Sequence, residues 1–284
     1  MTRLLPEEHE PVSRYIHSLC GVALDQSKAY LVEGRLASLV EETGSVNFSG
    51  LVARAKADAS RTLDRRIVDA ITTGESLFFR DTAPFDLLRH KIVPEWIDRQ
   101  RSGPKRIRIW SAACSTGQEV YSIAILLKEL LGDPDRHGIR ILGTDISDAA
   151  VARASRGAFN DIDIARGLSD QLREKYFRRI ANGWQISDQI RAMASFQKLN
   201  LMQDFSALGR FEIVLCRNVA IYFTERDRTA LFARIERALQ PEGCLIVGAM
   251  ESLGGICPQF ESKRHLRSVF YQVKTAGPGR PVKA

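Results

Sequence analysis

Residues 106–132 read RIRIWSAACSTGQEVYSIAILLKELLG, and this stretch decides the fold class. Its first part, 106–113, is rich in β-branched and aromatic residues and ends in small ones, which predicts a strand followed by a turn. Its second part, 116–132, carries apolar residues at helical spacing. A strand that leads directly into a helix indicates an α/β unit.

The same alternation continues toward the C-terminus. Strand-like and helix-like stretches follow one another, which predicts a mainly parallel sheet with helices on both faces. The expected strands are 138–145, 196–201, 211–218 and 243–250, and the expected helices are 147–157 and 224–240. Residues 260–274 show no helical pattern and predict an antiparallel hairpin that ends the sheet.

The chain divides into several segments. Residues 1–72 carry apolar residues at helical spacing and predict an all-α domain. We expect a linker with a helix over 73–105, the α/β domain over 106–275 and a disordered tail over 276–284. Within the α/β domain, Asn182-Gly183 separates two short β-like runs, which predicts a small β-insertion over 176–196.

Composition argues against several classes of protein. The chain has 284 residues, 44% of them hydrophobic, with no long apolar run and no secretory signal, so we expect it in the cytoplasm. Its five cysteines form no C-x-x-C pair and its five histidines are dispersed, so no metal site is expected. The net charge of +7 admits nucleic acid, an anionic membrane or an acidic protein as partner, but no Lys/Arg run favours nucleic acid.

Polar residues stand where the expected strands end, which is the edge where open α/β sheets bind ligands. The first strand ends in SAACSTGQE, residues 111–119, whose small side chains let a ligand approach, and no G-x-G-x-x-G fingerprint is present. Glu119 either faces the ammonium of a methionine moiety or complements the helix dipole. Asp145, after the second strand, either accepts the ribose hydroxyls of a nucleoside or caps the next helix.

Later turns add Asn200, Arg217 and Asn218. Each alone is typical of a turn residue, but four strand ends that converge on one polar set favour a binding site. Residues 72–80, TTGESLFFR, join the helical part to the α/β part. Their Leu-Phe-Phe core, with Ser76 and Arg80 beside it, admits two interpretations: interdomain packing with a surface arginine, or part of the site.

Six segments together resemble the chemotaxis receptor methyltransferase (CheR) family. In chain order they are TTGESLFFR, IWSAACSTGQEVYSIAI, GTDIS, LNL, CRNVAIYF and LQPEGCLIVGAMES, and the resemblance spans residues 12–274. It implies a Rossmann-like S-adenosylmethionine-dependent methyltransferase domain with an inserted small antiparallel β-subdomain, preceded by an all-α N-terminal domain. Such enzymes transfer the methyl group of S-adenosylmethionine to receptor glutamates, giving γ-methyl esters and S-adenosylhomocysteine.

The resemblance also implies roles for individual residues. Arg80 and Tyr222 would be catalytic, facing the transferring methyl group and orienting the incoming carboxylate. The residues implied to line the cofactor are Ser76, Arg80, Glu119, Asp145, Asn200, Leu201, Arg217 and Asn218. A glutamate carboxylate is already ionised at neutral pH, so the reaction requires no general base and depends on alignment.

The implied partners are the cytoplasmic helices of methyl-accepting chemoreceptors, and we expect a monomer that inserts into no membrane. The short, glycine-poor turn at 180–183 argues against a tether to a receptor's C-terminal pentapeptide. The sequence departs from the family pattern at Gly74, Gln118 and Ala249-Met250. Two other functions stay open: a catalytically weak homologue that senses the cofactor or scaffolds a signalling array, and a methyltransferase for a small molecule or another protein.

Overall fold

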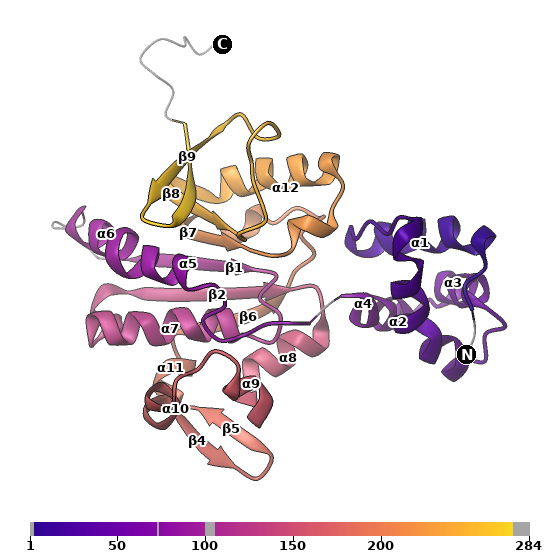
Figure 1. Ribbon diagram of the computed structural model, residues 1–284, viewed down its shortest axis with the longest axis horizontal. Coiled ribbons are helices and arrows are strands. Elements are labelled where there is room, and N and C mark those ends of the chain that lie inside the picture. Colours follow the sequence, from indigo (N-terminus) through magenta and orange to yellow (C-terminus); the bar gives the residue numbers. More distant parts are fainter. Residues whose placement is uncertain (1–2, 73, 100–105, 275–284) are drawn as a thin grey trace.

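The computed structural model describes residues 3–72, 74–99 and 106–274. In Figure 1 a helical N-terminal domain stands beside an α/β domain, from which a small second sheet projects. The predicted fold class is confirmed. The expected domain boundaries at 72/73 and 105/106 adjoin residues outside the described ranges and stay predictions, and the tail 276–284 lies outside them altogether. None of the described helices is long and apolar enough to cross a membrane.

The N-terminal domain has its own hydrophobic core. Its helices are α1 (Pro6–Cys20), η1 (Gln26–Lys28), α2 (Ala29–Glu42), α3 (Phe48–Ala57) and α4 (Thr62–Ile71). Their apolar faces meet around Val32, Leu36 and Phe48, each at most 1% exposed. Inside this domain the Tyr15 hydroxyl donates to the buried Asp64 carboxylate. The expected helices are therefore present, and they fold onto one another.

The α/β domain is built on a sheet with the strand order β6-β2-β1-β7-β8-β10-β9. Its strands are β1 (Ile107–Ala112), β2 (Ile139–Asp145), β6 (Ala194–Lys198), β7 (Phe211–Cys216), β8 (Leu239–Val247), β9 (Phe260–His265) and β10 (Ser268–Val273). The first five in sheet order are parallel, and β9 and β10 form an antiparallel hairpin beside β8. The predicted parallel core and closing hairpin are thus confirmed. Because β2 and β7 flank β1, the strand order reverses at β1 and opens a crevice at the carboxyl ends.

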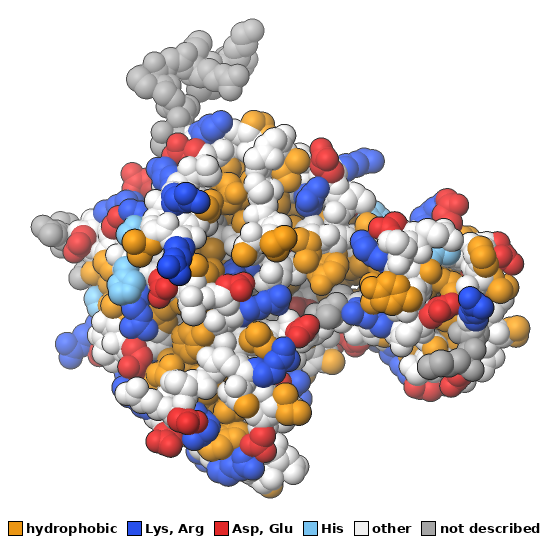
Figure 2. Space-filling view, viewed as in Figure 1, with side chains coloured by type: hydrophobic (Ala, Val, Ile, Leu, Met, Phe, Trp, Pro, Cys, Tyr) orange, Lys and Arg blue, Asp and Glu red, His pale blue; other side chains and the backbone are white. Residues whose placement is uncertain are grey.

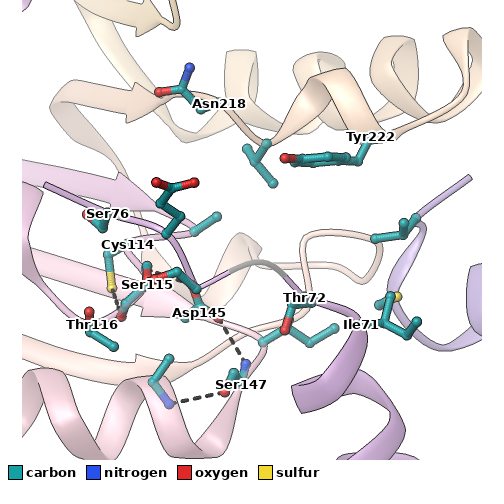
Figure 3. Close-up of a pocket in the computed structure, with 18 of the residues that line it drawn as sticks. Ile71, Thr72, Ser76, Cys114, Ser115, Thr116, Asp145, Ser147, Asn218 and Tyr222 are labelled. Atoms are coloured by element: carbon teal, nitrogen blue, oxygen red, sulfur yellow. Dashed lines mark hydrogen bonds between the residues drawn. The ribbon is translucent and has the colours of Figure 1, made fainter. Parts of the chain in front are cut away.

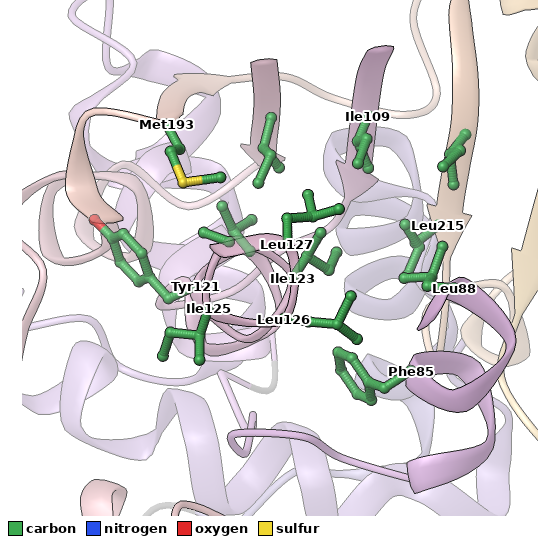
Figure 4. Packing of buried hydrophobic residues seen from close by; sticks show 14 of the residues in the cluster. Phe85, Leu88, Ile109, Tyr121, Ile123, Ile125, Leu126, Leu127, Met193 and Leu215 are labelled. Atoms are coloured by element: carbon green, nitrogen blue, oxygen red, sulfur yellow. The ribbon is translucent and has the colours of Figure 1, made fainter. Parts of the chain in front are cut away.

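Helices cover both faces of this sheet (Figure 1). The long helices are α7 (Gln118–Leu131), α8 (Asp148–Arg156) and α12 (Glu225–Ala238). The linker forms α5 (Thr82–Leu87), η2 (Leu88–Ile92) and α6 (Val93–Arg99). Short helical turns are η3 (Pro134–His137), η4 (Ser206–Leu208) and η5 (Ala220–Tyr222). Helix α7 is apolar on most sides because it packs between the sheet, the linker and the inserted unit. Figure 4 shows Phe85 and Leu88 of the linker in one cluster with Leu126 of α7 and Leu215 of β7.

The inserted unit differs from the expected span 176–196 at both ends. It comprises β3 (Ala158–Phe159), α9 (Asp161–Ala165), α10 (Asp170–Tyr176), β4 (Phe177–Ile180), β5 (Gly183–Ile186) and α11 (Asp188–Arg191). Its sheet has the order β3-β5-β4, so a strand before residue 176 pairs with the hairpin, whereas residues 194–196 belong to β6 of the main sheet. The turn residues are Ala181 and Asn182, and Gly183 begins β5. Glycine is required there because an added Cβ would lie 2.2 Å from the Phe159 carbonyl oxygen.

Phe78 anchors the linker to the inserted unit. Its side chain is fully buried, and its ring centroid lies 5.0 Å from that of Phe159 and 5.6 Å from that of Phe177, both edge-to-face. Gly167 packs directly on the Phe78 backbone, because an added Cβ at Gly167 would lie 1.9 Å from the Phe78 carbonyl oxygen. The apolar part of the linker is therefore held in place on two sides.

We expect Phe78→Ala to lower the free energy of unfolding by about 3–5 kcal/mol, because the rings around it cannot fill the cavity. Urea denaturation followed by circular dichroism measures this quantity. Leu266→Ala is the control: that side chain is 72% exposed, and its loss should cost less than about 0.5 kcal/mol. Equal stability of the two variants would show that Phe78 does not anchor the linker.

Candidate active site

A cavity of about 720 Å³ lies at the carboxyl ends of the parallel strands, between the two domains. The notch between the domains is visible in Figure 2, and Figure 3 shows Ser76, Asp145 and Tyr222 around the cavity. The structure brings together every side chain that the sequence assigns to the site, and all line this cavity: Ser76, Arg80, Glu119, Asp145, Asn200, Leu201, Arg217, Asn218 and Tyr222.

The turns that build the cavity adopt left-handed backbone at residues other than glycine. Five of the eight such residues in the described ranges flank the site, namely Phe79 (φ 51°), Asp81 (φ 58°), Ala113 (φ 58°), Ser115 (φ 52°) and Asn218 (φ 57°). This conformation costs a residue with a side chain roughly 1–2 kcal/mol and persists only where surrounding contacts impose it. Such clustering is typical of functional sites.

Asp145 is 9% exposed at the end of β2. The Ser115 N–H donates to its Oδ2 at 2.8 Å and the Ser147 N–H to its Oδ1 at 3.0 Å. Burial raises the pKa of Asp145, and these N–H groups oppose the shift. Ser147 caps α8 by accepting from the Ala150 N–H, so the alternative in which Asp145 caps this helix is wrong. A carboxylate accepts about four hydrogen bonds, so Asp145 has capacity for two more donors.

Arg217 follows β7 and is enclosed by protein, with its side chain 2% exposed. Its Nη1 donates to Glu119 Oε2 at 2.7 Å, while Nη2 donates to Asp81 Oδ2 at 2.9 Å and to the Arg80 carbonyl oxygen at 2.7 Å. Glu119 also accepts from the Ser111 hydroxyl at 2.7 Å. Glu119 lies in the first turn of α7 and lines the cavity, so both of its interpretations stay open. Both terminal nitrogens of Arg217 bind the protein itself.

The Arg80 turn is fixed through its backbone. Its carbonyl oxygen accepts from Arg217, and the neighbouring Phe79 N–H donates to the Ser122 hydroxyl at 2.9 Å. Arg80 lines the cavity, and its guanidinium makes no hydrogen bond or ion pair with any residue that the structure describes, although its charge adds to that of Arg166 in lowering the pKa of Glu75. Both interpretations of residues 72–80 therefore hold in part, since Phe78 is packed and Arg80 faces the site.

Tyr222 lies in the loop after β7, at the mouth of the cavity, and is 37% exposed. Its hydroxyl forms no hydrogen bond within the described ranges, and its carbonyl oxygen accepts from the Ala23 N–H of the N-terminal domain at 2.8 Å. The same loop contains Asn218, whose N–H donates to Glu251 at 2.7 Å. Glu251 is not among the site residues expected from the sequence, although it belongs to residues 248–252 (GAMES), which end the last of the six segments that carry the resemblance. We call these five residues the GAMES segment.

Asn200 connects the site to the N-terminal domain. Its Nδ2 donates to the Leu19 carbonyl oxygen at 2.8 Å, and its Oδ1 accepts from the Met202 N–H at 2.9 Å. Leu201 is 6% exposed and packs in the core beneath α12. Both residues line the cavity, but both ends of the Asn200 amide already have protein partners.

The departures from the family pattern leave this arrangement intact. Gln118 is buried, and its side-chain oxygen accepts from the Thr116 hydroxyl at 2.8 Å. The Gly74 carbonyl oxygen accepts from the Ser115 hydroxyl at 2.9 Å. Met250 is 88% exposed and so contributes to the surface rather than to the cavity wall.

Two cysteines lie at the strand ends that form the site, and both are buried. Burial raises the pKa of the Cys114 and Cys216 thiols well above its usual range, so both are protonated at neutral pH. Over residues 3–72, 74–99 and 106–274, no cluster of three or more His, Cys, Asp and Glu side chains is placed to hold a metal ion.

Comparison with known proteins identifies the family. Residues 7–72 match the family model of the CheR methyltransferase all-alpha domain, and residues 74–268 match that of the CheR methyltransferase SAM binding domain. The chain is 38% identical over 266 residues to chemotaxis protein methyltransferase Cher2 of Pseudomonas putida, which covers 92% of this chain and 95% of that protein. Chemotaxis protein methyltransferase 1 of Pseudomonas aeruginosa is 36% identical over 265 residues, with the same coverage.

Among solved structures, a TehB-like SAM-dependent methyltransferase from Corynebacterium glutamicum is 17% identical with a TM-score of 0.38, covering 63% of this chain and 86% of that one. The family assignment rests instead on the two family models and the relatives of nearly equal length. The chain therefore belongs to the CheR methyltransferase family and is an S-adenosylmethionine-dependent chemotaxis methyltransferase.

Proposed function

We propose that this enzyme methylates glutamate side chains on the cytoplasmic helices of chemoreceptors and so forms γ-methyl esters. The observation that carries the proposal is a pair of donors from residues that line the cavity, the Arg80 guanidinium and the Tyr222 hydroxyl, that form no hydrogen bond or ion pair with the described residues. Both groups suit a carboxylate, and the guanidinium adds a positive charge. Glutamate is also the substrate that the family implies.

The cavity fits S-adenosylmethionine in size and in its polar groups. Its volume of about 720 Å³ lies within the usual range for small-molecule sites. Asp145 has acceptor capacity for the ribose hydroxyls, and Glu119 has a negative charge for the amino-acid end. The remaining residues that we propose to line the cofactor are Ser76, Arg80, Asn200, Leu201, Arg217 and Asn218. When bound, the cofactor supplies an electrophilic methyl group on a positively charged sulfur.

The residues of this chain act by alignment rather than by proton transfer. An unperturbed glutamate has a pKa of about 4.3, so its carboxylate is already a nucleophile at neutral pH. We propose that Arg80 and Tyr222 donate to one carboxylate oxygen and leave the other directed at the methyl group. Correct placement of two reactants can lower a barrier by up to about 7–11 kcal/mol. Pairing of Arg80 with both oxygens would weaken the nucleophile.

For the protein partner, we propose an acidic receptor helix that docks beside α2. Leu31 and Arg35 of this helix, and Lys28 just before it, line the cavity together with the catalytic pair. We further propose that the enzyme works in the cytoplasm as a monomer and without a pentapeptide tether. The two-residue turn between β4 and β5 supports the last point, because the loop there is short and glycine-poor.

One assay separates this function from its alternatives. The wild-type enzyme is incubated with tritiated S-adenosylmethionine and receptor cytoplasmic domains, and base-labile methanol release is counted. Label in the receptor supports glutamate ester formation. Cofactor binding without label in any protein favours a cofactor-sensing or scaffolding role, and label in a small molecule favours the other methyltransferase alternative.

We expect Arg80→Ala to reduce kcat/KM for the receptor at least about 100-fold, which corresponds to about 2.7 kcal/mol of transition-state stabilisation. Arg80→Lys should recover only part of this loss, because lysine keeps the charge but not the planar fork. Circular dichroism and melting temperature control for folding. Arg136→Ala removes an exposed arginine outside the cavity and should be fully active. Near-normal turnover in Arg80→Ala would make this arginine a surface residue only.

We expect Asp145→Ala to weaken binding of S-adenosylhomocysteine at least about tenfold, or about 1.4 kcal/mol, because the ribose loses its acceptor. Isothermal titration calorimetry measures the affinity. Asp148→Ala, at a half-exposed carboxylate at the start of α8, is the matched control and should bind normally. Unchanged affinity in a folded Asp145→Ala variant would refute the assignment.

A peptide with the sequence of a receptor C-terminal pentapeptide should bind this enzyme with a dissociation constant above about 100 µM, weaker than about −5.5 kcal/mol. The reason is the short, glycine-poor turn at Ala181 and Asn182 that joins β4 to β5. Fluorescence anisotropy of a labelled peptide measures the affinity. A low-micromolar dissociation constant would contradict the untethered mode.

A further inference from the structure

Glu251 lies in the segment after β8 and holds the loop that contains Asn218 and Tyr222. Its Oε2 accepts from the Asn218 N–H and the Gly248 N–H, both at 2.7 Å. Its Oε1 accepts from the Val219 N–H at 3.2 Å and the Ile221 N–H at 3.3 Å. One carboxylate thus accepts from four backbone N–H groups, three of which belong to the loop after β7.

This arrangement requires a carboxylate. Each oxygen of an ionised glutamate accepts two hydrogen bonds, and bonds to a charged acceptor are shorter and stronger than neutral ones. The amide of glutamine has one acceptor oxygen, and its NH₂ group would face two N–H donors. Glu251→Gln would therefore keep the size of the side chain and lose about half of the contacts.

Gly248 shows how closely the chain is packed around this carboxylate. A Cβ at this position would lie 2.7 Å from Glu251 Oε2, 2.8 Å from Asn218 Nδ2 and 3.0 Å from the Asn218 backbone nitrogen. Only glycine leaves room for the carboxylate to reach the loop. The Gly248 and Glu251 positions therefore act as one unit, with Ala249 and Met250, which depart from the family pattern, between them.

The loop that Glu251 holds is the one that presents Tyr222. Asn218 is left-handed at φ 57°, a conformation that its N–H bond to Glu251 stabilises. Val219 and Ile221 are fixed by the same carboxylate, and the Tyr222 N–H donates to the Val219 carbonyl oxygen at 3.1 Å. Asp145 is held by a different set of N–H groups, those of Ser115 and Ser147.

We propose that Glu251 is a positioning residue for methyl transfer: it acts through the loop after β7 to hold Tyr222 against the substrate carboxylate, and leaves ribose binding to Asp145. The inference rests on the proposed function of Tyr222. It assigns a role to the carboxylate of the GAMES segment, which the set of residues expected from the sequence does not contain.

The test is a double-mutant cycle between Glu251→Gln and Tyr222→Phe in the full-length enzyme, with steady-state rates measured at varied receptor concentration. Each single variant should lower kcat for receptor methylation about tenfold or more. Because Glu251 acts through Tyr222, Tyr222→Phe should lower kcat less than about threefold further in the Glu251→Gln background. Binding of S-adenosylhomocysteine should change less than about threefold in Tyr222→Phe, and in Glu251→Gln it should fall by less than kcat does, because Asn218 also lines the cavity.

Gly248→Ala provides a second route to the same result. It keeps the glutamate and its charge but displaces the carboxylate, so it should reproduce the fall in kcat and add little to Glu251→Gln. Gly254→Ala and Glu261→Gln are the controls, because a Cβ added at Gly254 would lie no closer than 3.4 Å to any neighbour and Glu261 is half-exposed on β9. Both should stay within about twofold of wild type.

Wild-type turnover in this assay tests the proposed function, and the variant ratios test the role of Glu251. Independent, multiplying effects of Glu251→Gln and Tyr222→Phe would overturn the proposal. So would a parallel loss of S-adenosylhomocysteine affinity or wild-type activity of Glu251→Gln. If Glu251→Gln has a melting temperature far below that of the wild type, the same cycle is run between Gly248→Ala and Tyr222→Phe. Effects on kcat that multiply in that cycle would also overturn the proposal.

Discussion

A buried positive charge at the carboxyl edge of the sheet constrains the whole site. Burial of a guanidinium costs several kcal/mol unless carboxylates and hydrogen bonds compensate it, and loss of one partner is strongly destabilising. Arg217 meets this requirement with Glu119, Asp81 and the Arg80 carbonyl oxygen. Arg217 follows β7, Glu119 lies in the first turn of α7, and Arg80 and Asp81 lie in the linker before α5. The requirement to neutralise Arg217 therefore fixes three segments, distant in sequence, relative to one another.

The polar groups of the cavity divide into two sets according to their partners. Arg217 and Asn200 are engaged by protein atoms on each side and hold the walls in place. Within the described ranges, the Arg80 guanidinium and the Tyr222 hydroxyl have no such partners, although the backbone of each is held. A donor on a fixed backbone with no protein acceptor is prepared for a ligand, since binding displaces no internal hydrogen bond.

The sequence predicts the fold, and it predicts which residues line the cavity, for physical reasons. Carboxyl ends of parallel strands meet at one edge, so polar residues such as Asp145 and Asn218, each after its own strand, had to come together. Their partners could not be predicted in this way. Whether Asn200 faces a ligand or the Leu19 carbonyl oxygen depends on how the domains dock, which no local pattern encodes. The inserted unit was misplaced because β3 is two residues long and its pairing with β5 is a tertiary contact.

The N-terminal domain takes part in the geometry of the active site. The Ala23 N–H donates to the Tyr222 carbonyl oxygen, Asn200 donates to Leu19, and His17 lies 2.8 Å from Asp227 at the start of α12. Tyr222, which we propose orients the substrate, is thus held from both domains. Because the substrate glutamate is already ionised and needs no general base, the rate of methyl transfer depends on how accurately these contacts place its carboxylate. Substitutions that spare them, such as Met250 on the surface, are compatible with activity, whereas a shift between the domains would act directly on Tyr222.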